Sequence, residues 1–200
     1  QFRPRERAEL GAVLARYGLQ ELRYLLCVGT VEPRKNLLGL IQAYGRLPQA
    51  LRTAHPLVIA GARGWKTRAT ERALEPLERE GTLRRLDYVP QQELPALYAG
   101  AHAFAYPSLY EGFGLPVLEA LASGVPVLTS ERSSLPEVAG DAAWLCDPED
   151  IDAMAAGLRH LLEDDPWRRA AVAKGLARAA GFTWQRCVQE TVAVYQGACS

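Results

Sequence analysis

The sequence lacks an excess of charge of either sign, because 23 Lys and Arg residues are matched by 23 Asp and Glu residues. A chain without net charge has no overall field to draw it to nucleic acid or to an anionic membrane surface. We therefore expect no nucleic-acid partner. Any site for an anion has to be local.

Paired cysteines, metal-ligand clusters and long apolar runs are also missing. The four cysteines are scattered without a C-x-x-C pair, and the three histidines do not join them at metal-ligand spacing. No run is long enough to span a bilayer, and the opening "QFRPRERAEL" is too charged for a signal peptide. These absences indicate a cytoplasmic protein with reduced thiols and no metal. The start at Gln1, without Met, suggests a fragment or a processed chain.

What is present is an alternation of short apolar runs with longer amphipathic stretches. Continuous hydrophobicity in short runs is typical of strands buried on both faces of a parallel sheet. The pattern predicts one α/β domain over 1–200, a Rossmann-like doubly wound parallel sheet of about six strands with flanking helices. The expected strands are 24–29, 56–61, 86–89, 103–107, 126–130 and 143–147, and the expected helices are 36–46, 67–81, 92–100, 116–123, 150–163 and a terminal helix at 183–197, after an entering helix within 1–20.

Two residues bear on the ends and continuity of these helices. Asn36 is expected to cap helix 36–46, because a side-chain oxygen at that place can accept from a free helical N–H. Pro76 is expected to break or kink helix 67–81, because proline lacks the N–H that the helix needs.

Ligands bind at the carboxyl ends of the strands in open parallel sheets, so the loops that follow the strands are the expected place for a site. The loop "GTVEPRKN", residues 29–36, places Arg34 and Lys35 directly before a helix. Fixed cations beside free helical N–H groups form a local phosphate site. The alternative is a solvated basic pair, which is common.

The loop "GARGWKT", residues 61–67, is not a P-loop, because Lys66 does not follow a glycine at the required spacing. Gly61 and Gly64 are expected to allow a tight turn or a close approach of the backbone to a ligand. Trp65 is interpreted as a packing residue.

The stretch "YPSLYEGFGLPVLEA", residues 106–120, combines two acids with a glycine loop. Gly112 and Gly114 free the loop to present backbone N–H groups, and Glu119 is expected in the first turn of the next helix. Glu111 lies on the other side of whatever the glycines enclose. Two carboxylates around such a loop can hold the hydroxyls at both ends of a nucleotide sugar. Taken singly, Glu119 is better explained as a partner of the helix dipole and Glu111 as a loop carboxylate, but this interpretation explains the pair less well.

The motifs "VGTVEPRKNL", "LVIAGARGW", "YPSLYEGFGLPVLEALASGVPVLTS" and "SSLPEVAGDAAWLCDPED" occur in this order from about residue 20 to the end. Together they resemble the C-terminal, donor-binding half of the GT-B glycosyltransferases of family four, the glycosyl transferases group 1. This retaining group includes many bacterial mannosyl- and rhamnosyltransferases. Their E-x7-E pattern matches Glu111 and Glu119.

The resemblance implies a role for individual residues of this chain. Glu119 would hold the ribose hydroxyls, Glu111 would lie against the transferred sugar, and Arg34 with Lys35 would hold the diphosphate. Glu111, Arg34 and Lys35 are thus the implied catalytic residues. The other implied donor-binding residues are Gly29, Thr30, Val89, Gly112, Phe113, Gly114, Leu115 and Val117.

Two positions depart from the family pattern. Thr30 stands where some relatives have an arginine next to the phosphate, which leaves this loop less charged. His102 stands where an aspartate is common, and we interpret it as a structural residue. Asp150 and Asp152 match the D-x-D pattern of metal-dependent glycosyltransferases of another fold, but "DPED" is better explained as a helix start.

The implied activity is retaining glycosyl transfer from a nucleotide-diphosphate sugar, with GDP-mannose favoured, to a glycan or lipid-linked acceptor. No cofactor or metal is expected, since Arg34, Lys35 and a helix N-terminus can stabilise the leaving diphosphate. The N-terminal acceptor half is absent, so we expect the 200 residues alone to be inactive. The full enzyme is expected to associate peripherally with the cytoplasmic face of the inner membrane. The alternatives are a GT-B nucleotide-sugar epimerase and a non-catalytic nucleotide-binding module.

Overall fold

A single parallel sheet of six strands forms the centre of the computed structural model, which describes residues 1–62, 64 and 68–198. All five strand pairs are parallel, and the strand order is β3-β2-β1-β4-β5-β6. This arrangement confirms the predicted fold class. The strands are β1 Leu25–Val28, β2 Leu57–Ala60, β3 Leu83–Asp87, β4 Ala103–Tyr106, β5 Val127–Ser130 and β6 Ala143–Cys146.

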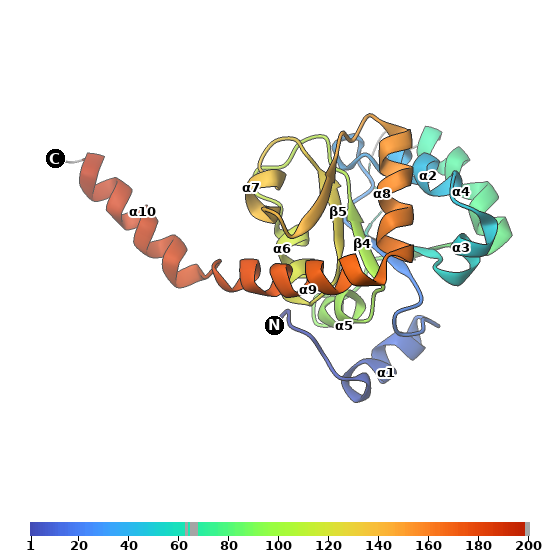
Figure 1. The fold of residues 1–200 in the computed structure, drawn as a ribbon, viewed down its shortest axis with the longest axis horizontal. Coiled ribbons are helices and arrows are strands. Elements are labelled where there is room, and N and C mark those ends of the chain that lie inside the picture. The colour runs from blue at the N-terminus through green and yellow to red at the C-terminus, as the bar shows by residue number, and fades with distance from the viewer. Residues whose placement is uncertain (63, 65–67, 199–200) are drawn as a thin grey trace.

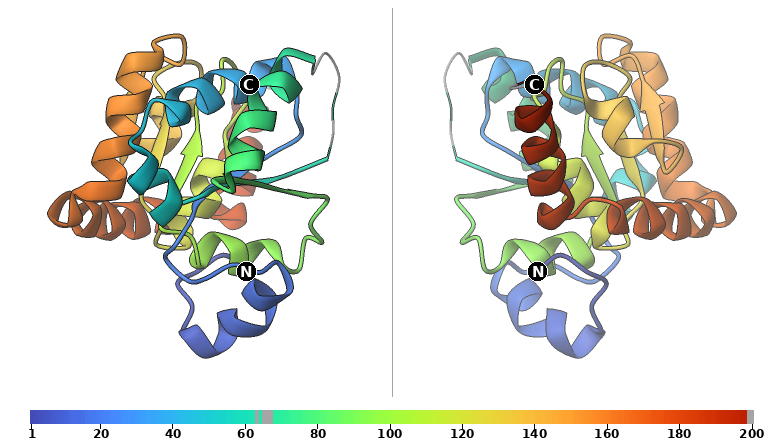
Figure 2. Two further views of the ribbon diagram at one scale, coloured as in Figure 1. Left: turned by 90° about the vertical axis from the view of Figure 1, so that its right-hand side faces the viewer. Right: turned by 90° about the vertical axis from the view of Figure 1, so that its left-hand side faces the viewer.

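Helices cover both faces of the sheet (Figure 1). Helices α2, α4 and α8 pack together on one face, and α5, α6, α7 and α9 cover the other, with α1 resting on α5 (Figure 2). Their bounds are α1 Arg7–Arg16, α2 Leu37–Gly45, α3 Gln49–Ala54, α4 Arg68–Glu80, α5 Leu94–Ala99, α6 Leu115–Ala122, α7 Leu135–Ala139, α8 Ile151–Glu163, α9 Asp165–Ala180 and α10 Trp184–Ala198, with a 3-10 helix η1 at Pro33–Lys35.

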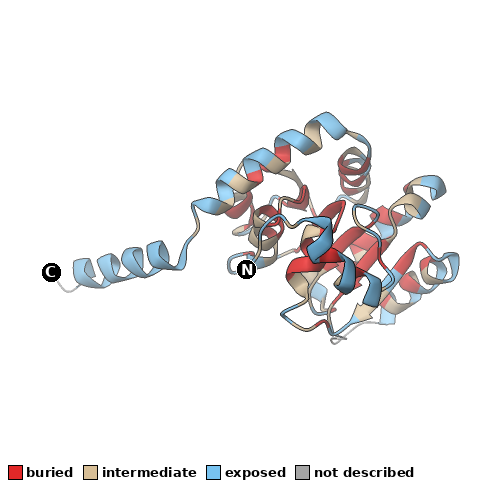
Figure 3. Cartoon of the chain, turned by 90° about the horizontal axis from the view of Figure 1, so that it is seen from below, coloured by how far each residue is buried: buried red, intermediate tan, exposed pale blue. Residues whose placement is uncertain are grey.

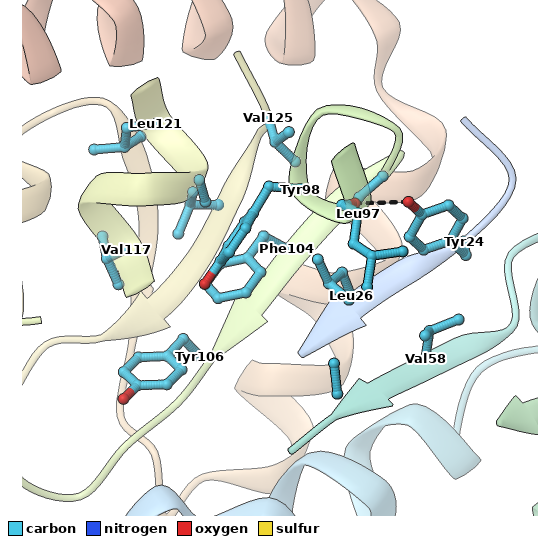
Figure 4. Close-up of a cluster of buried hydrophobic side chains, with 14 of the residues drawn as sticks. Tyr24, Leu26, Val58, Leu97, Tyr98, Phe104, Tyr106, Val117, Leu121 and Val125 are labelled. Atoms are coloured by element: carbon cyan, nitrogen blue, oxygen red, sulfur yellow. Dashed lines mark hydrogen bonds between the residues drawn. The ribbon is translucent and has the colours of Figure 1, made fainter. Parts of the chain in front are cut away.

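Each face of the sheet has its own hydrophobic core, and strands β2, β4 and β5 are buried throughout, as is β1 up to its last residue (Figure 3). On the α5 and α6 side, Tyr98 lies over Phe104 with ring centroids 5.1 Å apart, and Val117 packs nearby (Figure 4). Tyr106 ends β4 at the margin of this cluster. Burial on both faces explains why the strands are apolar without alternation.

The order of the strands reverses between β1 and β4. Leu25 of β1 pairs with Leu57 of β2 on one side and with Ala103 of β4 on the other. The connections from β1 and β4 therefore leave the sheet side by side, at the topological switch point where open α/β sheets bind ligands. Both loops carry residues that the sequence analysis singled out.

Several expectations about individual elements were wrong. The third strand covers Leu83–Asp87 rather than 86–89. It is an edge strand that contains Arg84 and Arg85, so it lacks the continuous apolar run of the buried strands. Helix α4 continues through the exposed Pro76, so the proline does not break the helix. Residue 67, the expected first residue of that helix, lies outside the described residues.

The terminal helix α10 extends away from the rest of the molecule (Figure 1), and no residue in it is buried. Its exposed apolar side chains include Trp184, Val188, Val192 and Tyr195. The prediction of a helix at 183–197 is confirmed to within one residue at each end. Among the helices that the structure describes, none has the length and apolarity needed to cross a membrane.

Candidate functional site

The loop after β1 brings two cations to the carboxyl end of the sheet. The backbone N–H of Gly29 donates to Ala60 at 2.9 Å, which holds the start of the loop against β2. A Cβ atom on Gly29 would lie 3.8 Å from both Lys35 and the Tyr106 ring, so the glycine backbone lies against the lysine side chain. Arg34 and Lys35 follow in the short helix η1, with side chains 46% and 15% exposed.

Glu111 forms the centre of a hydrogen-bonded cluster, here called the clasp, with Lys35, Arg34 and Tyr106. Lys35 Nζ donates to Glu111 Oε1 at 2.7 Å, Arg34 Nη1 donates to Oε2 at 2.9 Å, and the Tyr106 hydroxyl donates to Oε1 at 2.9 Å. Lys35 also donates to the Tyr106 hydroxyl, and Arg34 pairs with Glu32 at 2.9 Å. The loops after β1 and β4 are thereby joined across the switch point.

Burial alone would raise the pKa of Glu111, whose side chain is only 8% exposed. Hydrogen bonds from Lys35 and Tyr106 outweigh burial and hold the pKa of Glu111 below its ordinary value. Burial, reinforced by the Glu111 charge, raises the pKa of Tyr106. The clasp therefore contains an ionised carboxylate and a protonated tyrosine that donates to it.

The clasp leaves hydrogen-bonding capacity for a ligand. A lysine ammonium group has three N–H donors, and two of those on Lys35 are used within the described residues, by Tyr106 and Glu111. The charges of Arg34 and Lys35 are balanced by Glu32 and Glu111. An anionic ligand can therefore use the third N–H donor of Lys35, displace a carboxylate from Arg34, or use donors outside the clasp.

The glycine loop supplies such donors. Gly114 has a φ of 108°, which favours glycine, and a Cβ atom there would lie 2.7 Å from Leu135. None of the described residues accepts a hydrogen bond from the backbone N–H groups of Phe113, Gly114 or Leu115. The Val117 N–H already donates to the Gly114 carbonyl group at 3.0 Å, so it reaches a ligand only by sharing that bond.

Glu119 lies in the second turn of α6 rather than in the first, because the helix begins at Leu115. It is too far along for the helix dipole to explain its presence. Burial raises the pKa of the half-buried Glu119, an effect that the neighbouring Tyr98 hydroxyl opposes. The two acids of the E-x7-E pattern therefore lie in opposite electrostatic environments, with one pKa lowered and the other raised.

Val89 and Thr30 remain predicted donor contacts, whereas Asn36 does not cap its helix. The Val89 side chain is buried in the core, so only its main chain can face a ligand, whereas Thr30 is exposed. Asn36 has a φ of 53° and its side chain donates to Pro148 at 2.6 Å instead of capping α2. That side chain lies over Gly39, where a Cβ atom would come within 2.6 Å of it.

His102 has a structural environment, remote from the clasp, at the start of β4. Its Nδ1 lies 3.1 Å from the Leu22 carbonyl oxygen, and its ring packs on His55 with centroids 4.1 Å apart. Burial, together with the nearby His55, lowers the pKa of His102 to about 4, so the ring is neutral at pH 7.

The D-x-D match is part of a helix start. Asp150 caps α8 by accepting from the Ala153 N–H at 2.9 Å, and Asp152 pairs with Arg46. Within the described part of the chain, no three His, Cys, Asp or Glu side chains gather where they could hold a metal ion. Trp65 and Lys66 lie outside the described residues.

Sequence reasoning missed Tyr106, Ser133 and Ser134. Tyr106 is the last residue of β4, and its place at the carboxyl end of a predicted strand was a usable signal. The two serines contact the backbone of Glu111 from more than twenty residues away along the chain. No local sequence pattern predicts a hydrogen bond between residues so far apart along the chain.

The sequence pattern of the glycosyl transferases group 1 matches residues 15–178. The chain belongs to this family. The match covers the described strands, the clasp and α6, so the residues assembled above are those of a glycosyl transferases group 1 domain.

Relatives of this group 1 domain are longer proteins. The chain is 49% identical over 193 residues to the O-antigen chain mannosyltransferase B of Escherichia coli. That match covers 96% of this chain and 51% of the relative, so the chain spans about half the length of the curated relative.

Solved structures share the fold of this group 1 domain. The C-terminal domain of a glycosyl transferase group 1 family protein from Francisella tularensis matches with a TM-score of 0.73 at 20% identity, over 90% of this chain and 94% of that one. The Anabaena Alr3699/HepE protein in complex with UDP and glucose matches with a TM-score of 0.81 at 16% identity, over 98% of this chain and 53% of that one. At these identities the likeness establishes the fold, which is that of a C-terminal GT-B domain.

Proposed function

We propose that this chain is the donor-binding half of a retaining mannosyltransferase that uses GDP-mannose and transfers mannose to a glycan or a lipid-linked acceptor. The observation that carries the proposal is the clasp. It fixes two cations and a carboxylate beside the open N–H groups of the glycine loop, at the switch point of the sheet.

The clasp suits the stabilisation of a departing diphosphate. Breaking the anomeric bond leaves new negative charge on the nucleotide, and fixed donors stabilise that charge without reorganising. Lys35 and Arg34 are held in place by Glu111 and Tyr106, while the N–H groups of Phe113, Gly114 and Leu115 lie at the start of α6. In this proposal the diphosphate contacts both sets of donors, and no metal is needed.

Glu111 is a poor base in this environment, because its lowered pKa and three hydrogen bonds stabilise the ionised form. We assign it to holding the hydroxyls of the transferred sugar and to orienting the cations. Glu119 holds the ribose. The raised pKa of Glu119 reflects a partly dry environment in which a hydrogen bond to a carboxylate is strong.

The choice of mannose and of a bacterial polysaccharide acceptor is supported by the similarity to the mannosyltransferase of Escherichia coli. In this proposal the acceptor site belongs to a segment outside these 200 residues, and the reaction takes place at the cytoplasmic face of the membrane. None of the contacts described above favours the epimerase or the non-catalytic alternative.

The test is a calorimetric titration of the chain with GDP-mannose, UDP-glucose, GDP and UDP, each with EDTA and with Mg²⁺. We expect GDP-mannose and GDP to bind equally well with either addition, UDP and UDP-glucose to bind more weakly, and mannose transfer by the chain alone to be undetectable. Binding of GDP-mannose only with Mg²⁺ would contradict the metal-independent site. Preference for UDP-glucose would overturn the choice of donor. Efficient mannose transfer by these residues alone would overturn the proposal that the acceptor site lies outside them.

A further inference from the structure

Beside the clasp lies the connection between β5 and α7, residues 131–134, which contacts the backbone of the glycine loop. Ser133 Oγ accepts a hydrogen bond from the Glu111 N–H at 3.0 Å. The Ser134 hydroxyl lies 3.0 Å from the carbonyl oxygen of Glu111 and 2.8 Å from that of Phe113, and its single proton can be donated to either. Both backbone polar groups of Glu111 are therefore held by this serine pair.

Ser133 adopts a backbone conformation that favours glycine, with a φ of 54°. Such a conformation persists in a non-glycine residue only when surrounding contacts hold it, and it is most frequent at functional sites. At Ser133 the contact that the side chain makes is the bond to the Glu111 N–H.

The connection is anchored to the sheet at its other end. The Glu131 N–H donates to the Cys146 carbonyl group of β6 at 3.0 Å, and Arg132 pairs with Asp147 and Glu149, each at 2.7 Å. Leu135, directly after the serines, is fully buried and packs against Gly114. The serines therefore anchor the loop that carries Glu111 to the sheet.

We propose that Ser133 and Ser134 are positioning residues that hold the backbone of Glu111, and through it the Glu111 carboxylate, in register with the transferred sugar. This inference rests on the proposed function. The Glu111 side chain is fixed by Lys35, Arg34 and Tyr106, whereas its backbone is fixed by the serines. Loss of the Ser133 hydroxyl should therefore weaken recognition of the sugar more than that of the nucleotide, because Ser133 bonds the residue assigned to the sugar and not the N–H groups assigned to the diphosphate.

The experiment compares the binding of GDP-mannose and GDP to the chain and to Ser133→Gly. Glycine accepts the positive φ, so this change removes the hydroxyl group without backbone strain. We expect GDP-mannose to bind roughly 3-fold to 10-fold more weakly, the loss of about one net hydrogen bond, with GDP affinity changed less than about twofold. Ser133→Asn, a residue that tolerates this conformation and offers a side-chain oxygen, should restore part of the loss.

Two further measurements separate a positioning role from a general structural one. The Glu111 amide proton should exchange with solvent faster in Ser133→Gly than in the wild-type chain, a readout that needs no ligand. Ser133→Gly should weaken GDP-mannose binding no further in a Glu111→Gln background. The control is Ser123→Ala, because Ser123 is buried and its hydroxyl has no hydrogen-bond partner among the described residues.

The outcomes are distinct. If wild-type chain binds neither GDP-mannose nor GDP, the proposed function fails and this inference fails with it. If wild-type chain binds both and Ser133→Gly binds both equally well, the inference is overturned while the proposed function stands. An equal loss of GDP and GDP-mannose affinity also overturns it, because that result indicates a structural role alone.

Discussion

Lys35→Met is expected to weaken GDP binding by roughly 10-fold to 100-fold, which corresponds to the loss of one charge-assisted hydrogen bond to the diphosphate. The reason is the placement of the Lys35 ammonium group. It is 15% exposed, is held by Glu111 and Tyr106, and retains one N–H donor that no described residue uses. Titration calorimetry of the chain with GDP measures the change directly.

The same substitution should also destabilise the fold. Glu111, 8% exposed, would lose its 2.7 Å partner and keep Arg34 and Tyr106. We expect the free energy of unfolding to fall by about 1 to 3 kcal/mol, measured by urea denaturation. Lys174→Met is the matched control, because Lys174 pairs with Asp141 on the exposed surface, and it should change stability by less than about 0.5 kcal/mol.

Measuring both GDP affinity and the free energy of unfolding shows which outcome would contradict the role of Lys35 in phosphate binding. A Lys35→Met chain that unfolds more easily yet binds GDP with wild-type affinity would show that Lys35 is structural. Lys35 would then have no role in phosphate binding.

Glu119→Gln is expected to weaken GDP-mannose binding by roughly 10-fold to 100-fold, because a carboxylate that accepts from ribose hydroxyls contributes more than a neutral amide. The effect should depend on the ribose. Wild-type chain should discriminate clearly between GDP and 2′-deoxy-GDP, and Glu119→Gln should discriminate much less. Equal discrimination by the two proteins would contradict the assignment of Glu119 to the ribose.

The raised pKa of Glu119 adds a pH dependence to this prediction. GDP-mannose affinity should fall as the pH is lowered through the raised pKa, since the protonated group is a weaker acceptor, and Glu119→Gln should remove that fall. For stability the sign is opposite. The contribution of a group with a raised folded-state pKa is present below its ordinary value of 4.5 and is lost as the pH rises through the folded-state pKa. Glu119→Gln should therefore raise the melting temperature at pH 7.

The contribution of Glu111 to stability depends on pH in the opposite direction. Its pKa is lowered, so its stabilising contribution is present above the ordinary value of 4.5 and is lost as the pH falls through the lowered folded-state pKa. Acid should therefore weaken the ribose contact at Glu119 before it opens the clasp.

The parts of the fold that burial determines were predictable from the sequence. Strands such as Leu57–Ala60 are apolar throughout because helices cover both of their faces, and helix α2 buries Leu40 and Tyr44, which recur at helical spacing. The edge strand β3 was misplaced because Arg84 and Arg85 interrupt its apolar pattern. A strand that is buried on both faces can be predicted from its continuous apolar run, whereas an edge strand lacks that run.

The candidate site was predictable from the sequence in part of its residues and in little of its geometry. The E-x7-E pattern and the basic pair marked Glu111, Glu119, Arg34 and Lys35. No pattern showed that Glu111 pairs with both cations, because those contacts join residues more than seventy positions apart. The side chain of Asn36 escaped prediction for the same reason, since its partner is Pro148 rather than its own helix.

The most direct test of the clasp as a donor site is a crystal structure of the chain bound to GDP-mannose. We predict that the diphosphate contacts Lys35 and the N–H groups at the start of α6, that the ribose hydroxyls contact Glu119, and that the mannose contacts Glu111. A donor bound elsewhere on the chain, or a diphosphate at this edge of the sheet that does not contact Lys35, would contradict the account.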